Sequence, residues 1–482
     1  MNKNLPMFFS LFAALSLLFS CKGVLPPQAC GAVPTENQLA WHEREQYAFI
    51  HFTTNTFTDK EWGYGDEPES VFNPTDFNAE QWAQTCRDAG LKGIVLTCKH
   101  HDGFCLWNSA YTEHSVKNSP WLNGKGDVVK AVSDACRKYG LFFGIYLSPW
   151  DRNHAEYANP EYISYYRNQL TELLTHYGEV SEIWLDGANG GDGYYGGANE
   201  KRKITVDYYD WRGTIELIRR LAPKAVVFSD AGPDVRWCGN ESGFAGETNW
   251  CNLSLDTLYP GKPDIMQLLN NGEENGTSWT PAEVDVSIRP GWFYHASEDD
   301  RVKSPEKLFQ IYMQSVGRGA NLLLNLPPDR RGLLNERDVD SLKMWKKRLD
   351  ETFATNLAAN CDVKADSYRG KVRKFAAKNA TDGDKETYWA TDDKVTVGTL
   401  EMAFEKPIVA KYILIQEYIR LGQRVKAFEI EAKKGGVWEK IAGGTTIGYK
   451  RILPLDNVET SAIRLKITDS KACPLISNVE VF

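Results

Sequence analysis

The stretch Glu182-Ile183-Trp184-Leu185-Asp186-Gly187 predicts a short buried strand that ends in a carboxylate and opens into a glycine loop. Because side chains alternate faces along a strand, Trp184 and Asp186 share one face and Leu185 takes the other. Asp186 is then either a cap of the following turn or a reactive carboxylate held beside an indole. The pattern of the surrounding chain bears on this choice.

Similar apolar runs recur before and after this strand, and amphipathic helical patterns lie between them. The predicted strands are residues 47–52, 93–98, 141–147, 182–186, 225–229, 284–288 and 321–326. The predicted helices are residues 76–89, 127–139 and 163–177, each followed by glycine. Glycine is the common residue just after the end of a helix, where the chain turns into the next strand.

Alternation of strand and helix indicates a parallel sheet. The length of the repeating region suits a (β/α)8 barrel, which typically needs ~250 residues, and an open doubly wound sheet is the alternative. Polar and aromatic residues follow every predicted strand instead of one switch point, which favours the barrel. We therefore predict an α/β fold with a (β/α)8-type barrel over residues 34–352.

The pattern changes after about residue 352 to short alternating segments at 399–404, 411–416, 427–432, 462–467 and 478–482. Such segments are typical of an all-β sandwich. The string Ala380-Thr381-Asp382-Gly383-Asp384 with Trp389 resembles a discoidin-like (coagulation-factor type C) domain. We predict a β-sandwich over residues 353–482. The resemblance implies that it binds carbohydrate or structural calcium, or that it only supports the barrel.

The first residues of the chain include Lys3, then a short apolar run, and then Leu18-Phe19-Ser20-Cys21. This beginning resembles a bacterial lipoprotein signal, in which the cysteine becomes lipidated, and an ordinary cleaved secretion signal is the alternative. We predict a signal peptide over residues 1–21 that ends at the lipobox Cys21. We therefore predict that the protein is an exported bacterial lipoprotein, periplasmic or anchored to the outer membrane. The lipid is its only predicted membrane contact.

The composition of the chain bears on which classes of partner the protein can bind. The net charge is −8 without a basic block, which argues against nucleic acid or an anionic membrane surface. The chain has 15 Trp and 22 Tyr, and aromatic rings can cover the apolar faces of sugars, although large cores use them too.

Chemically active side chains follow the predicted strands. His51 follows the first strand and His100-His101 the second, and these are three of only eight His in the chain. Adjacent residues on a strand point to opposite faces, and no Cys/His ligand spacing occurs, so we predict no metal site. Neutral imidazoles that hydrogen-bond sugar hydroxyls suit the pattern better.

Several strings together resemble the α-L-fucosidases of glycoside hydrolase family 29. They are His51-Phe52, Lys99-His100-His101-Asp102-Gly103-Phe104, Trp184-Leu185-Asp186-Gly187, Arg236-Trp237-Cys238-Gly239-Asn240-Glu241 and Pro290-Gly291-Trp292-Phe293-Tyr294-His295. The resemblance covers most of residues 40–350 and implies a retaining mechanism with Asp186 as nucleophile. The predicted substrate-binding residues are His51, Glu61, Trp62, His100, His101, Tyr146, Trp184, Arg236 and Trp292.

The acid/base residue is implied by the branch of the family that the string ending in Glu241 resembles. That branch prefers α-1,3- and α-1,4-linked fucose, and it implies Glu241 as acid/base, with Glu247 and Glu283 as alternatives. Fucosylated oligosaccharides or glycoconjugates are then the partners, and no cofactor is expected. The rival functions are a non-catalytic carbohydrate-binding protein and a barrel glycosidase for another sugar such as galactose.

Overall fold

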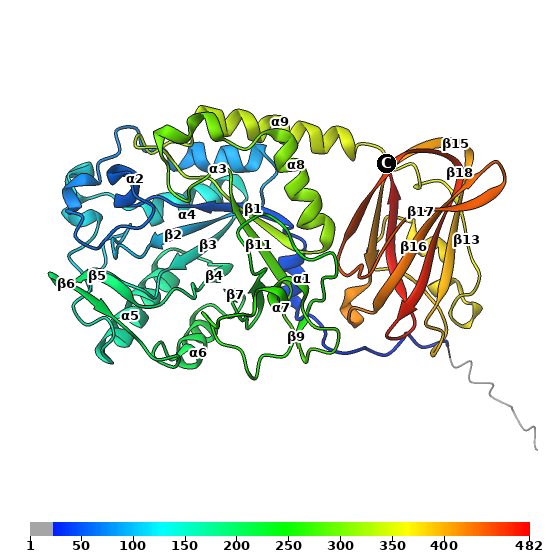
Figure 1. The fold of residues 1–482 in the computed structure, drawn as a ribbon, viewed down its shortest axis with the longest axis horizontal. Helices are drawn as coiled ribbons and strands as arrows, with labels where there is room; N and C mark the ends of the chain where they lie inside the picture. The colour runs from blue at the N-terminus through cyan, green and yellow to red at the C-terminus, as the bar shows by residue number, and fades with distance from the viewer. Residues whose placement is uncertain (1–22) are drawn as a thin grey trace, which may run out of the picture.

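The computed structural model describes residues 23–482, so the predicted signal peptide and Cys21 lie outside the described residues. Two domains lie side by side, an α/β barrel and a smaller β domain (Figure 1). Within residues 23–482, no helix combines the length and apolarity needed to cross a membrane.

The first domain is a closed barrel of eight parallel strands, as the alternating pattern predicts. Its strand order is β1-β12-β11-β8-β7-β4-β3-β2. The strands are β1 (Gln46–Ile50), β2 (Gly93–Lys99), β3 (Phe142–Leu147), β4 (Glu182–Trp184), β7 (Val226–Ser229), β8 (Val235–Trp237), β11 (Ala282–Ser287) and β12 (Asn321–Asn325).

Helices surround the barrel (Figure 1). They are α1 (Glu36–His42), α2 (Thr54–Thr58), α3 (Ala79–Asp88), α4 (Val128–Tyr139), α5 (Glu161–His176), α6 (Trp211–Leu221), α7 (Met266–Asn271), α8 (Pro305–Gln314) and α9 (Glu336–Thr352). The two ends of α4 show how the sequence determines where a helix begins and ends. The Asp127 side chain accepts the Lys130 N–H at its N-terminus, and Gly140 adopts a left-handed conformation after its last turn.

Strand residues alternate between two cores. Tyr47, Phe49 and Trp184 belong to an aromatic cluster inside the barrel, whereas Ala48 and Ile50 pack under the helices. This alternation carries every second side chain of a strand toward the interior, and the interior residues nearest the carboxyl ends face the barrel mouth.

The strand β8 is missing from the strands predicted from the sequence, which pass from residues 225–229 directly to residues 284–288. Three residues are too few to show an alternating period, yet β8 pairs in parallel with both β7 and β11. Val235 and Trp237 pack on the interior aromatic cluster. Arg236 between them therefore points outward.

Connections after the barrel strands add two small antiparallel pairs. The segment after β4 forms a hairpin of β5 (Gly191–Tyr195) and β6 (Ala198–Arg202), and β9 (Asn252–Leu253) pairs with β10 (Ser278–Trp279).

The second domain is an antiparallel β structure with its own apolar core. Its strands are β13 (Asp362–Ala365), β14 (Trp389–Ala390), β15 (Gly398–Glu417), β16 (Val425–Lys434), β17 (Val437–Gly444), β18 (Arg451–Ser470) and β19 (Leu475–Val481). The segments predicted at 399–404 and 411–416 are parts of one long strand, β15, because an irregularity between Ala403 and Ile408 interrupts the alternation without ending the pairing.

The two domains share buried contacts. The ring of Phe353, just after α9, lies 5.0 Å from that of Phe482 and 5.8 Å from that of Tyr412. The Lys450 ammonium group lies 2.5 Å from the carboxylate of Glu45 at the start of the barrel. Residues 24–30 also run along the β domain before α1 begins, as the blue segment of Figure 1 shows. The chain thus joins the domains at several points.

Candidate active site

A cavity of about 250 Å³ opens at the carboxyl ends of the barrel strands. Aromatic rings, imidazoles and carboxylates form its walls. The lining residues are Phe49, His51, Trp62, His100, His101, Tyr146, Trp184, Asp186, Ala188, Glu241, Asp285 and Trp292. Most of the residues predicted from sequence to bind substrate therefore surround one space.

Asp186 follows β4 directly and is held in one orientation. The Tyr146 hydroxyl donates to its Oδ2 at 2.8 Å, and the Ala188 N–H donates to its Oδ1 at 2.7 Å. His101 Nε2 lies 3.9 Å from the same Oδ2. Charge-assisted bonds of this kind stabilise a carboxylate in a fixed position.

The three imidazoles of the cavity are neutral at ordinary pH. Burial lowers the pKa of His51 to about 3 and that of His101 to about 4, and it lowers the pKa of His100 well below its usual value. His51 Nδ1 lies 2.8 Å from Asn325 Oδ1, and His101 Nδ1 lies 2.7 Å from Ser148 Oγ. These contacts orient the rings and leave their other nitrogens for a ligand.

Glu241 lies at the mouth of the cavity, on the segment after β8. The Trp292 indole N–H donates to its Oε2 at 3.2 Å. Although the side chain is exposed at the rim, the surrounding walls desolvate its carboxyl group and raise its pKa, and the charges of Asp186 and Glu61 raise it further. A raised pKa favours the protonated form of Glu241, and the general acid of a glycosidase must carry a proton that it can donate.

The two alternatives for the acid/base lie elsewhere. Glu247 is exposed and pairs with Arg318 at 3.3 Å, outside the cavity lining. Glu283 is fully buried in the barrel interior, where Tyr47 and Trp184 donate to its two oxygens. Of the three carboxylates, Glu241 alone lines the cavity.

Asp285 lines the cavity although sequence reasoning did not select it. The Trp237 indole N–H donates to its Oδ1 at 2.8 Å, and burial together with the charge of Glu241 raises its pKa well above the usual value. The signal was present in Ala282-Glu283-Val284-Asp285-Val286, where carboxylates occupy alternate positions of an apolar strand. Such carboxylates face one side of the sheet, and their burial costs free energy, so they are candidates for a functional role.

Two predicted substrate-binding residues, Glu61 and Arg236, do not line the cavity. Glu61 accepts the backbone N–H groups of Trp292 and Phe293 at 2.8 and 3.0 Å, so it positions the loop that carries Trp292. Arg236 is fully buried on the outer side of β8 and donates to the carbonyl groups of Leu269, Thr280 and Trp250. The structure does not bring Arg236 to the cavity, because strand alternation turns it away.

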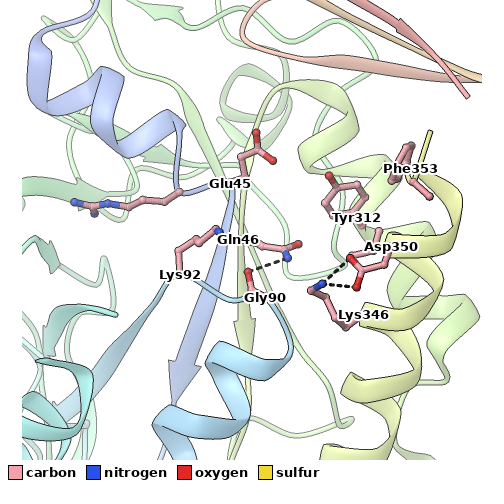
Figure 2. Close-up of a pocket in the computed structure, with 11 residues that line it drawn as sticks. Glu45, Gln46, Gly90, Lys92, Tyr312, Lys346, Asp350 and Phe353 are labelled. Carbon is pink, nitrogen blue, oxygen red and sulfur yellow. Dashed lines mark hydrogen bonds and ion pairs between the residues drawn. The ribbon is translucent and has the colours of Figure 1, made fainter. Parts of the chain in front are cut away.

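A larger hollow of about 440 Å³ lies at the opposite end of the barrel, near the starts of β1 and β2 (Figure 2). Two contacts join labelled residues in this hollow, between Lys346 and Asp350 and between Gln46 and Gly90. Residues at this end of such barrels generally serve stability. The candidate active site is therefore the smaller cavity.

Within residues 23–482, no group of three or more His, Cys, Asp or Glu side chains is placed to hold a metal ion. A barrel with a carboxylate pair, neutral imidazoles and aromatic rings at its carboxyl end belongs to the class of glycoside hydrolases. Comparison with known proteins narrows this class. The family model for alpha-L-fucosidase matches residues 27–350, and that for the F5/8 type C domain matches residues 362–479.

Relatives and solved structures agree with these matches. Alpha-L-fucosidase 1 of Arabidopsis thaliana is 41% identical, across 100% of this chain and 94% of the relative. A glycoside hydrolase 29 family member from an unknown rumen bacterium has a TM-score of 0.85 and 45% identity, with 94% of this chain and 78% of that chain covered. A fucosidase of Ruminococcus gnavus in complex with fucose has a TM-score of 0.85 and 33% identity, with 95% and 96% covered. The chain belongs to the alpha-L-fucosidase family, glycoside hydrolase family 29.

Proposed function

We propose that this protein is a retaining exo-α-L-fucosidase that removes terminal α-1,3- and α-1,4-linked L-fucose from branched glycans. The observation that carries the proposal is the placement of Asp186 and Glu241 on one cavity of about 250 Å³, with Asp186 held by two donors and Glu241 at the mouth. The interior residues Trp184 and Glu283 close the cavity toward the barrel centre. A closed inner end favours a terminal sugar over an internal one.

The proposed reaction has two displacements. In the first, an Asp186 oxygen forms a bond to the anomeric carbon while the bond to the leaving oxygen breaks, and Glu241 gives its proton to that oxygen. In the second, Glu241 removes a proton from water, the water oxygen bonds to the anomeric carbon, and Asp186 leaves as a carboxylate. Both carboxyl groups return to their starting states.

The other cavity residues hold the sugar. Neutral imidazoles can each donate or accept one hydrogen bond from a hydroxyl, and the aromatic rings cover the apolar ring face. Asp285, kept protonated by its raised pKa, adds a carboxyl group that can donate to a hydroxyl. Trp62, 57% exposed at the rim, is placed to contact the sugar that carries fucose.

Product analysis tests the proposal. Oligosaccharides with 1,2-, 1,3-, 1,4- and 1,6-linked fucose, an aryl α-L-fucoside and an aryl galactoside would be incubated with the protein, and early products followed by NMR. We expect α-L-fucose as the first product, mainly from the 1,3 and 1,4 linkages. Equal rates on all linkages would refute the linkage preference, β-fucose as first product would refute retention, and preferred galactoside cleavage would identify another sugar.

We also propose that the chain is exported and anchored through a lipid on Cys21. The signal-like string Leu18-Phe19-Ser20-Cys21 supports this. In a bacterial host, the wild-type protein should become labelled when labelled fatty acid is supplied, and it should sediment with membranes. Cys21→Ser should lose both the label and the sedimentation, and an unlabelled wild type would contradict the proposal.

Catalysis is proposed to need no cofactor, because two carboxyl groups supply both the nucleophile and the proton. Chelation with EDTA should leave kcat/KM unchanged. The loop Asp382-Gly383-Asp384 of the β domain remains a candidate for structural calcium. In that case EDTA should lower the melting temperature and added calcium should restore it, with no change in kcat/KM.

A further inference from the structure

The second domain carries a local concentration of positive charge that the overall charge of −8 does not show. Residues 369–378 contain two arginines and three lysines, and no aspartate or glutamate. We call this stretch the basic segment. It lies between β13 and β14 in the β domain (Figure 1) and is built mainly from the short 3-10 helices η6 (Arg369–Lys371), η7 (Arg373–Phe375) and η8 (Ala377–Ala380).

Most of this positive charge faces solvent. Four of the five cations are exposed, namely Lys371, Arg373, Lys374 and Lys378. None of the ion pairs formed within residues 23–482 involves these four side chains. Asp392, whose Oδ1 accepts the Gly370 N–H at 2.8 Å, offsets one of the charges and leaves an excess of three.

The fifth cation, Arg369, is buried and holds the beginning of the described chain. Its guanidinium donates to the two carboxylate oxygens of Asp393 at 2.7 and 3.0 Å and to the Leu25 carbonyl at 2.7 Å. Gly370 leaves room for Val24, because a Cβ atom at Gly370 would lie 2.5 Å from that side chain. Val24 also packs on a small apolar cluster of the β domain. The chain therefore begins against the basic segment.

This contact limits how far the basic segment can lie from Cys21. Cys21 and Val24 are three residues apart, so their Cα atoms are separated by at most ~11 Å. The electrostatic screening length is ~8–10 Å at 0.1 to 0.15 M salt. A lipid on Cys21 would therefore hold the exposed cations close enough to the bilayer for its surface charge to act on them.

An anionic leaflet attracts lysine and arginine over this range, and each such residue raises the partition of a protein onto the leaflet about fivefold. An excess of three positive charges corresponds to about a hundredfold preference for anionic over neutral lipid. We propose that the basic segment is a membrane-contact surface that binds the headgroups of anionic phospholipids. The proposal rests on the anchor at Cys21 proposed above. It adds a second contact to the lipid, which the overall charge of the chain left as the only predicted one.

The two contacts together fix the orientation of the protein on the membrane, because a lipid tether alone lets the protein rotate about its attachment point. The barrel meets the β domain at its amino-terminal end, where Glu45 pairs with Lys450. Figure 1 shows the hairpin of β5 and β6, which follows the carboxyl end of β4, at the opposite end of the molecule from the β domain. The cavity then faces away from the bilayer, where glycans can reach it.

The first measurement uses the lipidated full-length protein on vesicles of phosphatidylcholine, alone or with about 30% phosphatidylglycerol. Acetylation of lysines followed by mass spectrometry reports which ammonium groups the membrane covers. We expect Lys371, Lys374 and Lys378 to react about tenfold more slowly on the anionic vesicles, and high salt to remove this difference. Lys343 and Lys347, exposed on α9 of the barrel, should react equally on both kinds of vesicle.

The second measurement separates the basic segment from the lipid. Unlipidated Cys21→Ser protein should sediment with the anionic vesicles at low salt and not with the neutral ones. This binding should fall about tenfold or more when glutamine replaces the four exposed cations of the basic segment. The matched variant should bind as its parent does, and it carries glutamine at four exposed lysines of the barrel domain, namely Lys130, Lys224, Lys343 and Lys347. Melting temperature and aryl-fucoside turnover should be unchanged in both variants.

Equal acetylation of the basic segment on both kinds of vesicle would overturn the proposal, and so would unchanged sedimentation of its glutamine variant. Equally tight binding of the unlipidated protein to a DNA duplex would also overturn it, because it would indicate a general affinity for polyanions. Sedimentation of Cys21→Ser with anionic vesicles, combined with a wild type that takes up no fatty acid, would overturn only the proposed anchor. Absence of fucoside turnover would overturn only the proposed reaction.

Discussion

Asp186 and Glu241 line the same cavity in different surroundings. Asp186 accepts bonds from a phenol and a backbone amide, whereas Glu241 accepts one bond from the Trp292 indole at the rim. Donors favour a charged carboxylate, and desolvation favours a protonated one. This difference supports the division into nucleophile and acid/base.

Azide rescue distinguishes the two roles. Asp186→Ala should lower kcat on an aryl fucoside by ~10³-fold or more, and azide should restore turnover and give β-fucosyl azide, because only one displacement remains. Glu241→Ala should lose about 10²- to 10⁴-fold on oligosaccharides but less on an aryl fucoside with a good leaving group. Its azide product should be the α-fucosyl azide, and the opposite pair of products would reverse the assignment.

The pH profile depends on the Trp292 contact with Glu241. The indole N–H stabilises the ionised carboxylate and therefore lowers its pKa. Trp292→Phe removes this donor and keeps an aromatic ring, so the pKa should rise and the basic limb of kcat/KM should move to higher pH. A limb that stays or moves to lower pH would contradict the role of Glu241 as the acid.

Asp285→Asn is the matched variant for that experiment. Because the raised pKa of Asp285 keeps it protonated, asparagine resembles its working state, and the basic limb should not move. If Asp285 were ionised, its removal would relieve repulsion at Glu241 and shift the limb to lower pH. KM can rise in this variant without changing the limb.

At the scale of single elements, the three-residue strand β8 points two adjacent side chains, Arg236 and Trp237, to opposite sides of the sheet. Trp237 points inward and donates to Asp285. Arg236 points outward and donates to the carbonyl groups of Leu269 and Trp250. Asn249 Oδ1 accepts a further bond from Arg236 at 3.0 Å. The strand thereby connects the cavity wall to the structure behind it.

Arg236→Met should act on stability more than on sugar binding. Its loss leaves buried carbonyl groups without donors, and we expect the free energy of unfolding in urea to fall by about 3 kcal/mol. KM for an aryl fucoside should change less than about threefold at temperatures where the variant is folded. A large rise in KM with unchanged stability would restore the sequence-based role of Arg236 in substrate binding.

At the scale of the whole molecule, the domain boundary contains a nearly buried ion pair. Burial by itself would raise the pKa of Glu45, but the charge and hydrogen bond of Lys450 lower it overall. Tyr449 also donates to Glu45 at 3.1 Å. The pair joins the residue just before β1 of the barrel to the residue just before β18 of the second domain.

Lys450→Met should destabilise the protein by about 3 kcal/mol in urea, because Glu45 remains buried without its partner. Glu45 contributes stability above its unfolded pKa, near 4.5, and loses it as pH falls through the lower folded value. The difference between wild type and variant should therefore shrink below about pH 4.5. Arg420→Met breaks the exposed pair with Glu36 at the same boundary and should cost under about 1 kcal/mol.

Local patterns within the sequence determine much of this molecule. The 3.6- and 2-residue periods of apolar side chains, with the glycines after the helices, predict alternating strands and helices and a second all-β domain. The polar and aromatic residues after every strand favour a barrel over an open sheet. They also place His51, His100, Tyr146 and Asp186 at strand ends, and parallel strands bring all such ends to one face.

The tertiary structure alone decides which carboxylates meet. Glu241 lines the cavity, Glu283 lies beneath it and Glu247 lies outside, because strand register and loop paths set distances that no local period encodes. The same applies to Arg236, whose direction depends on the pairing of a strand too short to show in sequence. Asp285 enters the site because β11 turns that face toward the mouth, and pairing between distant segments determines that orientation.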